Sequence, residues 1–170
     1  MWICEETTAD HEAIARVIDA AFARAGHAGG SEARIVAALR AAGALSVSRV
    51  ADVDGRIVGH AALSPVTLDD GSSGWFGLGP VAVDPADQGR GVGSALVRAL
   101  LAELPALGAQ GCVVLGDPGW YARFGFRPVP ALRYRDAPAE YFQALLVGAG
   151  DAPQAQVAYH AAFSSSLSNA

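Results

Sequence analysis

Three glycines alternate with larger residues between positions 88 and 94, where the chain reads Gln-Gly-Arg-Gly-Val-Gly-Ser. An apolar run ends just before this segment at Val83, and an amphipathic pattern begins after it at Leu96. Glycines let consecutive backbone N–H groups face one concavity, and the first turn of a helix adds free donors and positive potential. The segment therefore predicts a diphosphate site. A tight strand-to-helix turn that holds no ligand is the alternative interpretation.

A dinucleotide-binding oxidoreductase is a second alternative for this loop. Its fingerprint is G-x-G-x-x-G, whereas the glycines at 89, 91 and 93 follow G-x-G-x-G. That fold also places an acidic ribose ligand about 20 residues further on, at the end of a strand. Glu103 lies only 14 residues beyond Gly89 and within the predicted helix. The spacing therefore disfavours a dinucleotide.

The composition excludes several other chemistries. All 12 basic residues of the 170 are arginine, so the chain has no Walker-type phosphate loop and no lysine for a Schiff base. The formal net charge of −5 argues against nucleic acid as a partner. The histidines and the two cysteines, Cys4 and Cys112, never fall at metal-ligand spacing, so we expect no metal.

The chain has the composition of a globular protein, with 52% hydrophobic and 17% charged residues. It lacks an apolar run long enough for a membrane span and a signal-like start, and two distant cysteines suit a reducing compartment. We therefore expect a cytoplasmic protein with no membrane partner. One domain is expected over 1–163, with a mobile tail over 164–170. The sequence leaves the oligomeric state open, and a homodimer is one possibility.

The elements expected around the glycine loop are those of an α+β domain. Two helices come first, from about 10 to 25 and from 32 to 42, the second capped by Ser31. Asp54-Gly55 then predicts a hairpin turn, and Pro80 predicts a bulge or splay in the strand over 75–83. The remaining expectations are hairpin strands at 45–52 and 56–68, a helix at 92–104, a strand at 110–115, a short helix near 119–124, strands around 126–134 and 139–147, and an apolar run at 157–163.

Two segments together resemble one known family. Gln88–Gly93 resembles the Q/R-x-x-G-x-G/A signature of the GNAT superfamily of N-acetyltransferases. Tyr121-Ala-Arg-Phe-Gly125-Phe126 resembles the family's later Y-x-x-x-G-F segment. The longer string Leu-Gly-Asp-Pro-Gly-Trp-Tyr-Ala-Arg-Phe-Gly-Phe over 115–126 is similar to that of a small bacterial subgroup, as are the tail segments 141–143 and 157–163. The resemblance covers nearly the whole chain.

This resemblance implies a mostly antiparallel mixed sheet that splays between two central parallel strands, with acetyl-coenzyme A (acetyl-CoA) as the cosubstrate. A backbone N–H near Val81–Val83 would stabilise the oxyanion. The chain departs from the family at Val114, where many members have an asparagine that contacts coenzyme A; Asp117 or Arg123 are candidate replacements. The residues implied to bind the cosubstrate are Val81, Ala82, Val83, Gln88, Gly89, Arg90, Gly91, Val92, Gly93 and Ser94.

The resemblance also assigns a general acid. Tyr121 would protonate the departing sulfur, and packing beside Phe124 and Phe126 is its alternative role. The base is left open. Glu32 at the start of the second helix is one candidate, although an acid there also complements the helix dipole. His60, His160 and water are the others, and His60 suits a hydrogen-bonded core position better.

The expected function is therefore transfer of an acetyl group from acetyl-CoA to an amine of a small molecule or a protein, by direct attack in a ternary complex. A catalytically silent acyl-CoA-binding module for sensing or interaction is the alternative.

Overall fold

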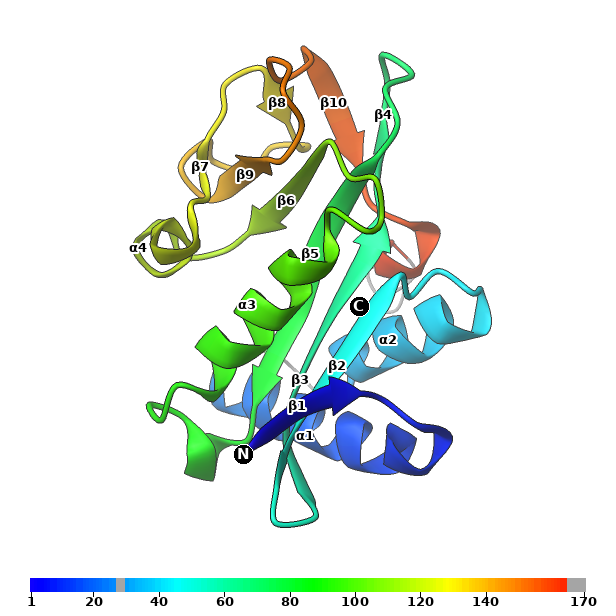
Figure 1. Cartoon of the computed structure of the whole chain (residues 1–170), viewed down its shortest axis with the longest axis vertical. Coiled ribbons are helices and arrows are strands. Elements are labelled where there is room, and N and C mark those ends of the chain that lie inside the picture. The colour runs from blue at the N-terminus through cyan, green and yellow to red at the C-terminus, as the bar shows by residue number, and fades with distance from the viewer. Residues whose placement is uncertain (27–29, 165–170) are drawn as a thin grey trace.

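The fold is built on a mixed sheet, seen in a computed structural model that describes residues 1–26 and 30–164. In this part of the chain the main sheet has seven strands in the order β1-β2-β3-β5-β6-β9-β7, and a small sheet has the order β4-β10-β8 (Figure 1). The strands are β1 Trp2–Glu5, β2 Val47–Val53, β3 Arg56–Pro65, β4 Thr67–Leu68, β5 Trp75–Val83, β6 Gly111–Leu115, β7 Arg127–Pro128, β8 Leu132–Arg133, β9 Phe142–Leu146 and β10 Ala155–Ala158. The helices are α1 His11–Arg24, α2 Ser31–Ala41, α3 Val92–Glu103 and α4 Pro118–Tyr121.

The predicted α+β class and most of the predicted elements are confirmed. Three expectations were wrong. Ser31 does not cap α2, because Gly30 in the left-handed region takes the N-cap position and Ser31 is the first helical residue. The strand expected over 56–68 breaks at Val66, so that Thr67 and Leu68 belong to the small sheet. The strand expected over 126–134 is two short strands, β7 and β8, in different sheets. Most of the predicted tail, 165–170, lies outside the described residues.

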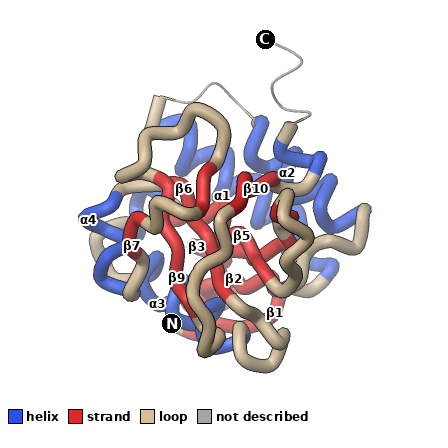
Figure 2. The backbone as a smooth tube through the Cα atoms, turned by 90° about the horizontal axis from the view of Figure 1, so that it is seen from above, coloured by secondary structure: helices blue, strands red, loops and turns tan. Residues whose placement is uncertain are grey.

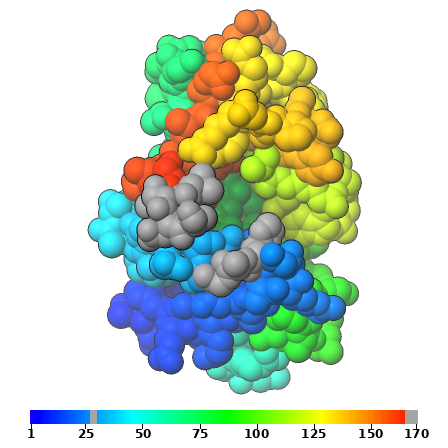
Figure 3. Space-filling model, turned by 180° about the vertical axis from the view of Figure 1, so that it is seen from behind, coloured from blue at the N-terminus to red at the C-terminus, as the bar shows by residue number. Residues whose placement is uncertain are grey.

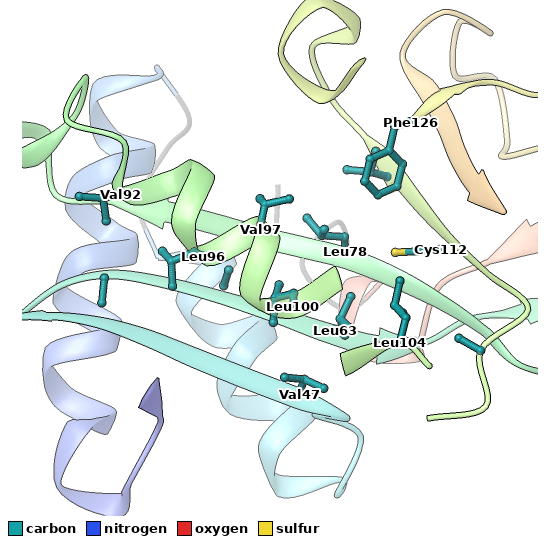
Figure 4. Packing of buried hydrophobic residues seen from close by; sticks show 14 of the residues in the cluster. Val47, Leu63, Leu78, Val92, Leu96, Val97, Leu100, Leu104, Cys112 and Phe126 are labelled. Atoms are coloured by element: carbon teal, nitrogen blue, oxygen red, sulfur yellow. The ribbon is translucent and has the colours of Figure 1, made fainter. Parts of the chain in front are cut away.

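One face of the sheet is covered by α3. Its apolar stripe points at β2, β3 and β5 (Figure 4), and Leu96, Val97 and Leu100 are completely buried there. Burying each such side chain contributes about 1.5–3 kcal/mol. Gly59 on β3 permits the close approach, since a Cβ there would lie 2.9 Å from side-chain atoms of Val92 and Leu96. This packing fixes the N-terminus of α3 at the end of β5.

The opposite face is covered by α1 and α2 (Figure 2). Ile14, Val17 and Ile18 of α1 pack against Val50 of β2 and Ala82 of β5. The small sheet lies further along the same face, over Trp75 and Val113. Within the described residues, no helix is long and apolar enough to cross a membrane.

The two central parallel strands separate soon after they meet. β5 and β6 pair only from Trp75↔Gly111 to Gly77↔Val113. The pairing of β5 with β3 shifts by one residue between Leu78 and Val81, which places Gly79 and Pro80 in a bulge. Proline has no N–H to donate to the ladder, so the bulge falls where the sequence predicts it. Beyond Gly77 the edge of β5 that faces β6 is therefore released.

A partly buried ion network joins the N-terminal segment to the sheet. Arg40 of α2 donates two hydrogen bonds to the Glu6 carboxylate, at 2.7 and 3.0 Å. Ser48 also donates to Glu6, and the Ser48 hydroxyl lies 2.8 Å from Nε2 of His60. Burial alone would raise the pKa of Glu6, but hydrogen bonds from His60, Arg40 and Ser48 and the Arg40 charge hold it well below its usual range.

This lowered pKa predicts an acid-sensitive step in stability. A carboxylate whose pKa is lower in the folded state stabilises the fold above its unfolded pKa of about 4.3, and the effect is lost as the pH falls below that value. The free energy of unfolding, measured by urea denaturation, should therefore decline from about pH 5 downward. In Glu6→Gln it should be lower at pH 7 and decline less on acidification. The exposed Glu140→Gln is the matched control, and a wild-type slope in Glu6→Gln would contradict the assignment.

Candidate active site

A cleft of about 480 Å³ lies where β5, the glycine loop, α1 and α4 meet. Predicted site residues supply much of its wall: Val81, Val83, Gln88, Gly89, Gly91, Val92, Gly93, Ser94 and Tyr121. Ala82 and Arg90 are absent from the wall within the described part of the chain. Ala82 faces the opposite side, buried against α1, because side chains alternate along a strand. The Arg90 side chain is 72% exposed.

The glycine loop has the backbone geometry of an anion site. Gly89 and Gly91 have φ angles of +77° and +83°, which disfavour any other residue, and a Cβ at either would meet open space. Gly91 is the N-cap of α3, and the first helical hydrogen bond runs from Ala95 N–H to its carbonyl. The N–H groups of the first turn thus have no acceptor within the helix and lie beside the cleft.

Side chains around the loop hold it in place. Asp87 is buried and forms an ion pair with Arg56 at 2.9 Å, and its other oxygen lies 3.4 Å from Arg90. Gln88 donates from Nε2 to the Val83 carbonyl at 3.0 Å. These contacts tie the loop back to the β2–β3 hairpin and to the end of β5. The buried Asp87 is a residue that sequence reasoning missed.

Tyr121 enters the cleft at the end of α4. Its ring packs edge-on against Trp120, with centroids 4.7 Å apart, and against Phe126 at 5.9 Å. Gly116 makes room for it, because a Cβ there would lie 2.5 Å from Cε2 of Tyr121. The predicted aromatic packing is therefore present, and the residue lines the cleft as well.

The surroundings keep the Tyr121 phenol protonated. Burial, and then the neighbouring Cys112, raise its pKa to about 12. The same burial raises the pKa of the Cys112 thiol. A thiolate formed in this region would thus be a much stronger base than in water, which favours proton transfer from a phenol to sulfur.

Positive charge gathers beside the aromatic wall. The Arg123 guanidinium lies 5.2 Å from the Trp120 ring centroid and 5.8 Å from that of Phe124, and Arg98 of α3 lies 5.5 Å from the Phe124 centroid. Within residues 1–26 and 30–164, neither arginine has a carboxylate in ion-pair range. The cleft mouth is therefore suited to an anionic ligand, and Arg123 lines its wall.

The candidate bases lie apart from this wall. Glu32 is in the first turn of α2, where it accepts a hydrogen bond from the Ser31 hydroxyl at 2.7 Å. His60 is fully buried in the Glu6 network, and Nδ1 of His160 accepts from Ala162 N–H. The two histidines thus have structural partners. The structure brings none of the three into the cleft wall as far as the chain is described.

Other site residues were not singled out by the sequence. Ala21, Phe22 and Ala25 at the end of α1 complete the wall, and the two alanines leave space there. The buried Gln143 of β9 is not part of the cleft wall as far as the chain is described, but it lies opposite Val114 and donates to the Gly116 carbonyl at 3.3 Å. A single glutamine in the apolar run Phe-Gln-Ala-Leu-Leu is the signal that could have identified it. Among the described residues no cluster could hold a metal ion.

Comparison with known proteins identifies this arrangement. Residues 45–128 match the family model of the acetyltransferase (GNAT) domain. A GNAT family acetyltransferase from Brucella melitensis, crystallised with acetyl-CoA, is 48% identical, with a TM-score of 0.84 over 95% of this chain and 97% of that one. YhbS from Escherichia coli, crystallised with CoA, is 32% identical, with a TM-score of 0.83 over 96% of this chain and 91% of that one.

The chain therefore belongs to the GNAT family and shares the fold of these two proteins. In a comparison of sequences alone, YhbS, named an uncharacterized N-acetyltransferase, is 40% identical over 97 residues, which span 56% of this chain and 58% of YhbS.

The contact between Gly116 and Tyr121 can be tested by stability measurements. Gly116→Ala should lower the free energy of unfolding by about 1–3 kcal/mol, because the added methyl group overlaps the Tyr121 ring. In a Tyr121→Ala background the same substitution should cost much less. Equal costs in the two backgrounds, measured by chemical denaturation, would show that the ring lies elsewhere.

Proposed function

We propose that the protein is an N-acetyltransferase that transfers an acetyl group from acetyl-CoA to an amine of a small molecule or a protein. The observation that carries this proposal is the released edge of β5, which runs beside the opening from β6 and ends at the glycine loop. Unpaired strand groups suit the amides of a pantetheine arm, and the loop N–H groups suit the adjoining diphosphate. The proteins from Brucella melitensis and Escherichia coli, crystallised with acetyl-CoA and CoA, support the same ligand.

Successive segments of the cleft wall fit successive parts of this ligand. The apolar Val81 and Val83 would line the arm, and Gln88 to Ser94 would hold the diphosphate. Arg90 would add only a screened contact, since its side chain is mostly exposed. A backbone N–H of the released edge near Val81 would bind the oxyanion.

The chemistry needs one proton donor and one free amine. The neutral amine nitrogen attacks the acetyl carbon, the carbon–sulfur bond breaks, and Tyr121 gives its proton to the departing sulfur. The nitrogen loses one proton, so the products are an amide and free CoA thiol, and Tyr121 is reprotonated from solvent. Water, reached from the open cleft, is the simplest acceptor of the amine proton, since Glu32, His60 and His160 stand outside the cleft wall.

Binding can be tested at the loop. Gly91→Val should weaken CoA at least about tenfold in calorimetry, because the side chain forces the loop from its left-handed geometry and obstructs the diphosphate. Gly43→Val is the matched control: Gly43 also has a positive φ, +66°, with open space around it, but lies at the end of α2. Equal CoA affinity in the two folded variants would remove the loop from the site.

Turnover can be tested at Tyr121. Tyr121→Phe keeps the ring, so CoA affinity should stay within a few-fold, whereas the maximal rate of thiol release should fall about 10²–10⁴-fold. Because the protonated form is active and its pKa is about 12, the wild-type rate should not decline from this group between about pH 8 and pH 10. A wild-type rate in Tyr121→Phe, with chemistry rate-limiting, would exclude the role. CoA binding without thiol release over a panel of amines would favour the sensing module.

A further inference from the structure

Tyr159, just after β10, has a buried hydroxyl group that lacks a hydrogen-bond partner within the described part of the chain. Among the described residues no donor or acceptor lies within hydrogen-bond distance of this oxygen. Burying a hydroxyl without a partner is unfavourable, and phenylalanine would fill the same space without that cost. The hydroxyl is therefore a candidate for contact with a ligand.

The ring of Tyr159 is held at the point where β5 and β6 separate. A Cβ on Gly77 would lie 2.6 Å from Cε1 of Tyr159, so the ring lies directly on this glycine. Gly77↔Val113 is the last pair before the parallel strands diverge. Tyr134 and Phe163 support the ring, with centroids 4.9 and 5.2 Å away. These contacts hold the ring in place against Gly77.

Tyr159 and Tyr121 approach the opening from opposite faces of the sheet. Tyr121 packs with Cys112 and Val114 in the cluster beneath α3. Tyr159 packs with Trp75 and Val113 in the cluster beneath the small sheet. On this second face, Figure 3 shows a hollow between the helical segments coloured blue to cyan and the later segments coloured yellow to red. A molecule that enters by the hollow approaches the opening from the side opposite the glycine loop and Tyr121.

We infer that the Tyr159 hydroxyl contacts the acceptor amine and orients it for attack. This inference rests on the proposed transfer reaction, in which Tyr121 serves the departing sulfur and leaves the other face of the opening to the nucleophile. The phenol oxygen accepts a hydrogen bond from an N–H of the neutral amine. The nitrogen lone pair is then free to point at the acetyl carbon.

No proton is exchanged at Tyr159 in this role. Burial, together with the neighbouring Cys112, Tyr134 and Tyr121 groups, raises its pKa far above neutrality, so the phenol stays protonated through any practical assay. A neutral amine suits this contact better than an ammonium ion, because an ammonium nitrogen has no lone pair with which to attack. The acceptor is therefore an amine that reaches this hydroxyl in its neutral form and still carries an N–H to donate.

The experiment is Tyr159→Phe in the full chain, with Tyr134→Phe as the matched control from the same aromatic cluster. Three amines are first tested with the wild type: tyramine, spermidine and a tetrapeptide with a free N-terminus. The one that is acetylated fastest is used as the probe. We expect kcat/KM for that amine to fall at least about tenfold, with the CoA dissociation constant and the shape of the pH profile unchanged. The control should stay within about twofold of the wild type.

The melting temperature of Tyr159→Phe provides a second test of the inference. Because the hydroxyl has no partner among the described residues, Tyr159→Phe should raise the melting temperature, by about 2–4 °C if one such penalty is removed. A lower melting temperature would mean that the protein itself satisfies the hydroxyl and would overturn the inference, as would unchanged amine kinetics. Failure of the wild type to release thiol with any of the three amines would instead count against the proposed function.

Discussion

The divergence of β5 from β6 is the constraint on which the rest of the site depends. Two parallel strands that stayed paired would bury every backbone group between them and leave nothing for a ligand to bind. Here the ladder ends at Gly77, and the bulge at Gly79–Pro80 turns the rest of β5 away. The edge so released would normally invite aggregation. In this fold the released edge faces a cleft, and a ligand can form hydrogen bonds with its unpaired N–H and C=O groups.

Different helices line the two sides of this opening. α3 is fixed against the sheet by its buried leucines, so its N-terminus and the glycine loop stay at the end of the released edge. The end of α1 forms another wall of the cleft with Ala21, Phe22 and Ala25. The polar interactions divide in the same way. The Glu6 network stabilises the far end of the sheet, whereas Tyr121 and Tyr159 stand near the opening with hydroxyl groups kept neutral by burial. Buried phenols near a reaction centre are useful because they hold their protons over a wide range of pH.

The local features that depend on backbone chemistry could be predicted from the residues alone. Glycines at 89 and 91 indicated the anion loop because few other residues adopt their φ angles, and Pro80 indicated the bulge because it lacks a donor. The family resemblance supplied the role expected of Tyr121 and the splay between two parallel strands, whereas the order of the elements followed from hydrophobic periodicity and turn residues. Ser31 misled as a helix cap because Gly30, which also favours N-terminal ends, stands directly before it.

Only the tertiary structure decided which distant residues meet. The pairing of Asp87 with Arg56 and the contact of Tyr159 with Gly77 join segments whose spacing in the chain carries no periodic signal. The small sheet could not be predicted either, since strands of two to four residues are too short to show an alternation of apolar and polar residues. Sequence patterns report the conformation of neighbours along the chain, whereas these contacts depend on how layers pack, and packing is decided by the shape of the whole core.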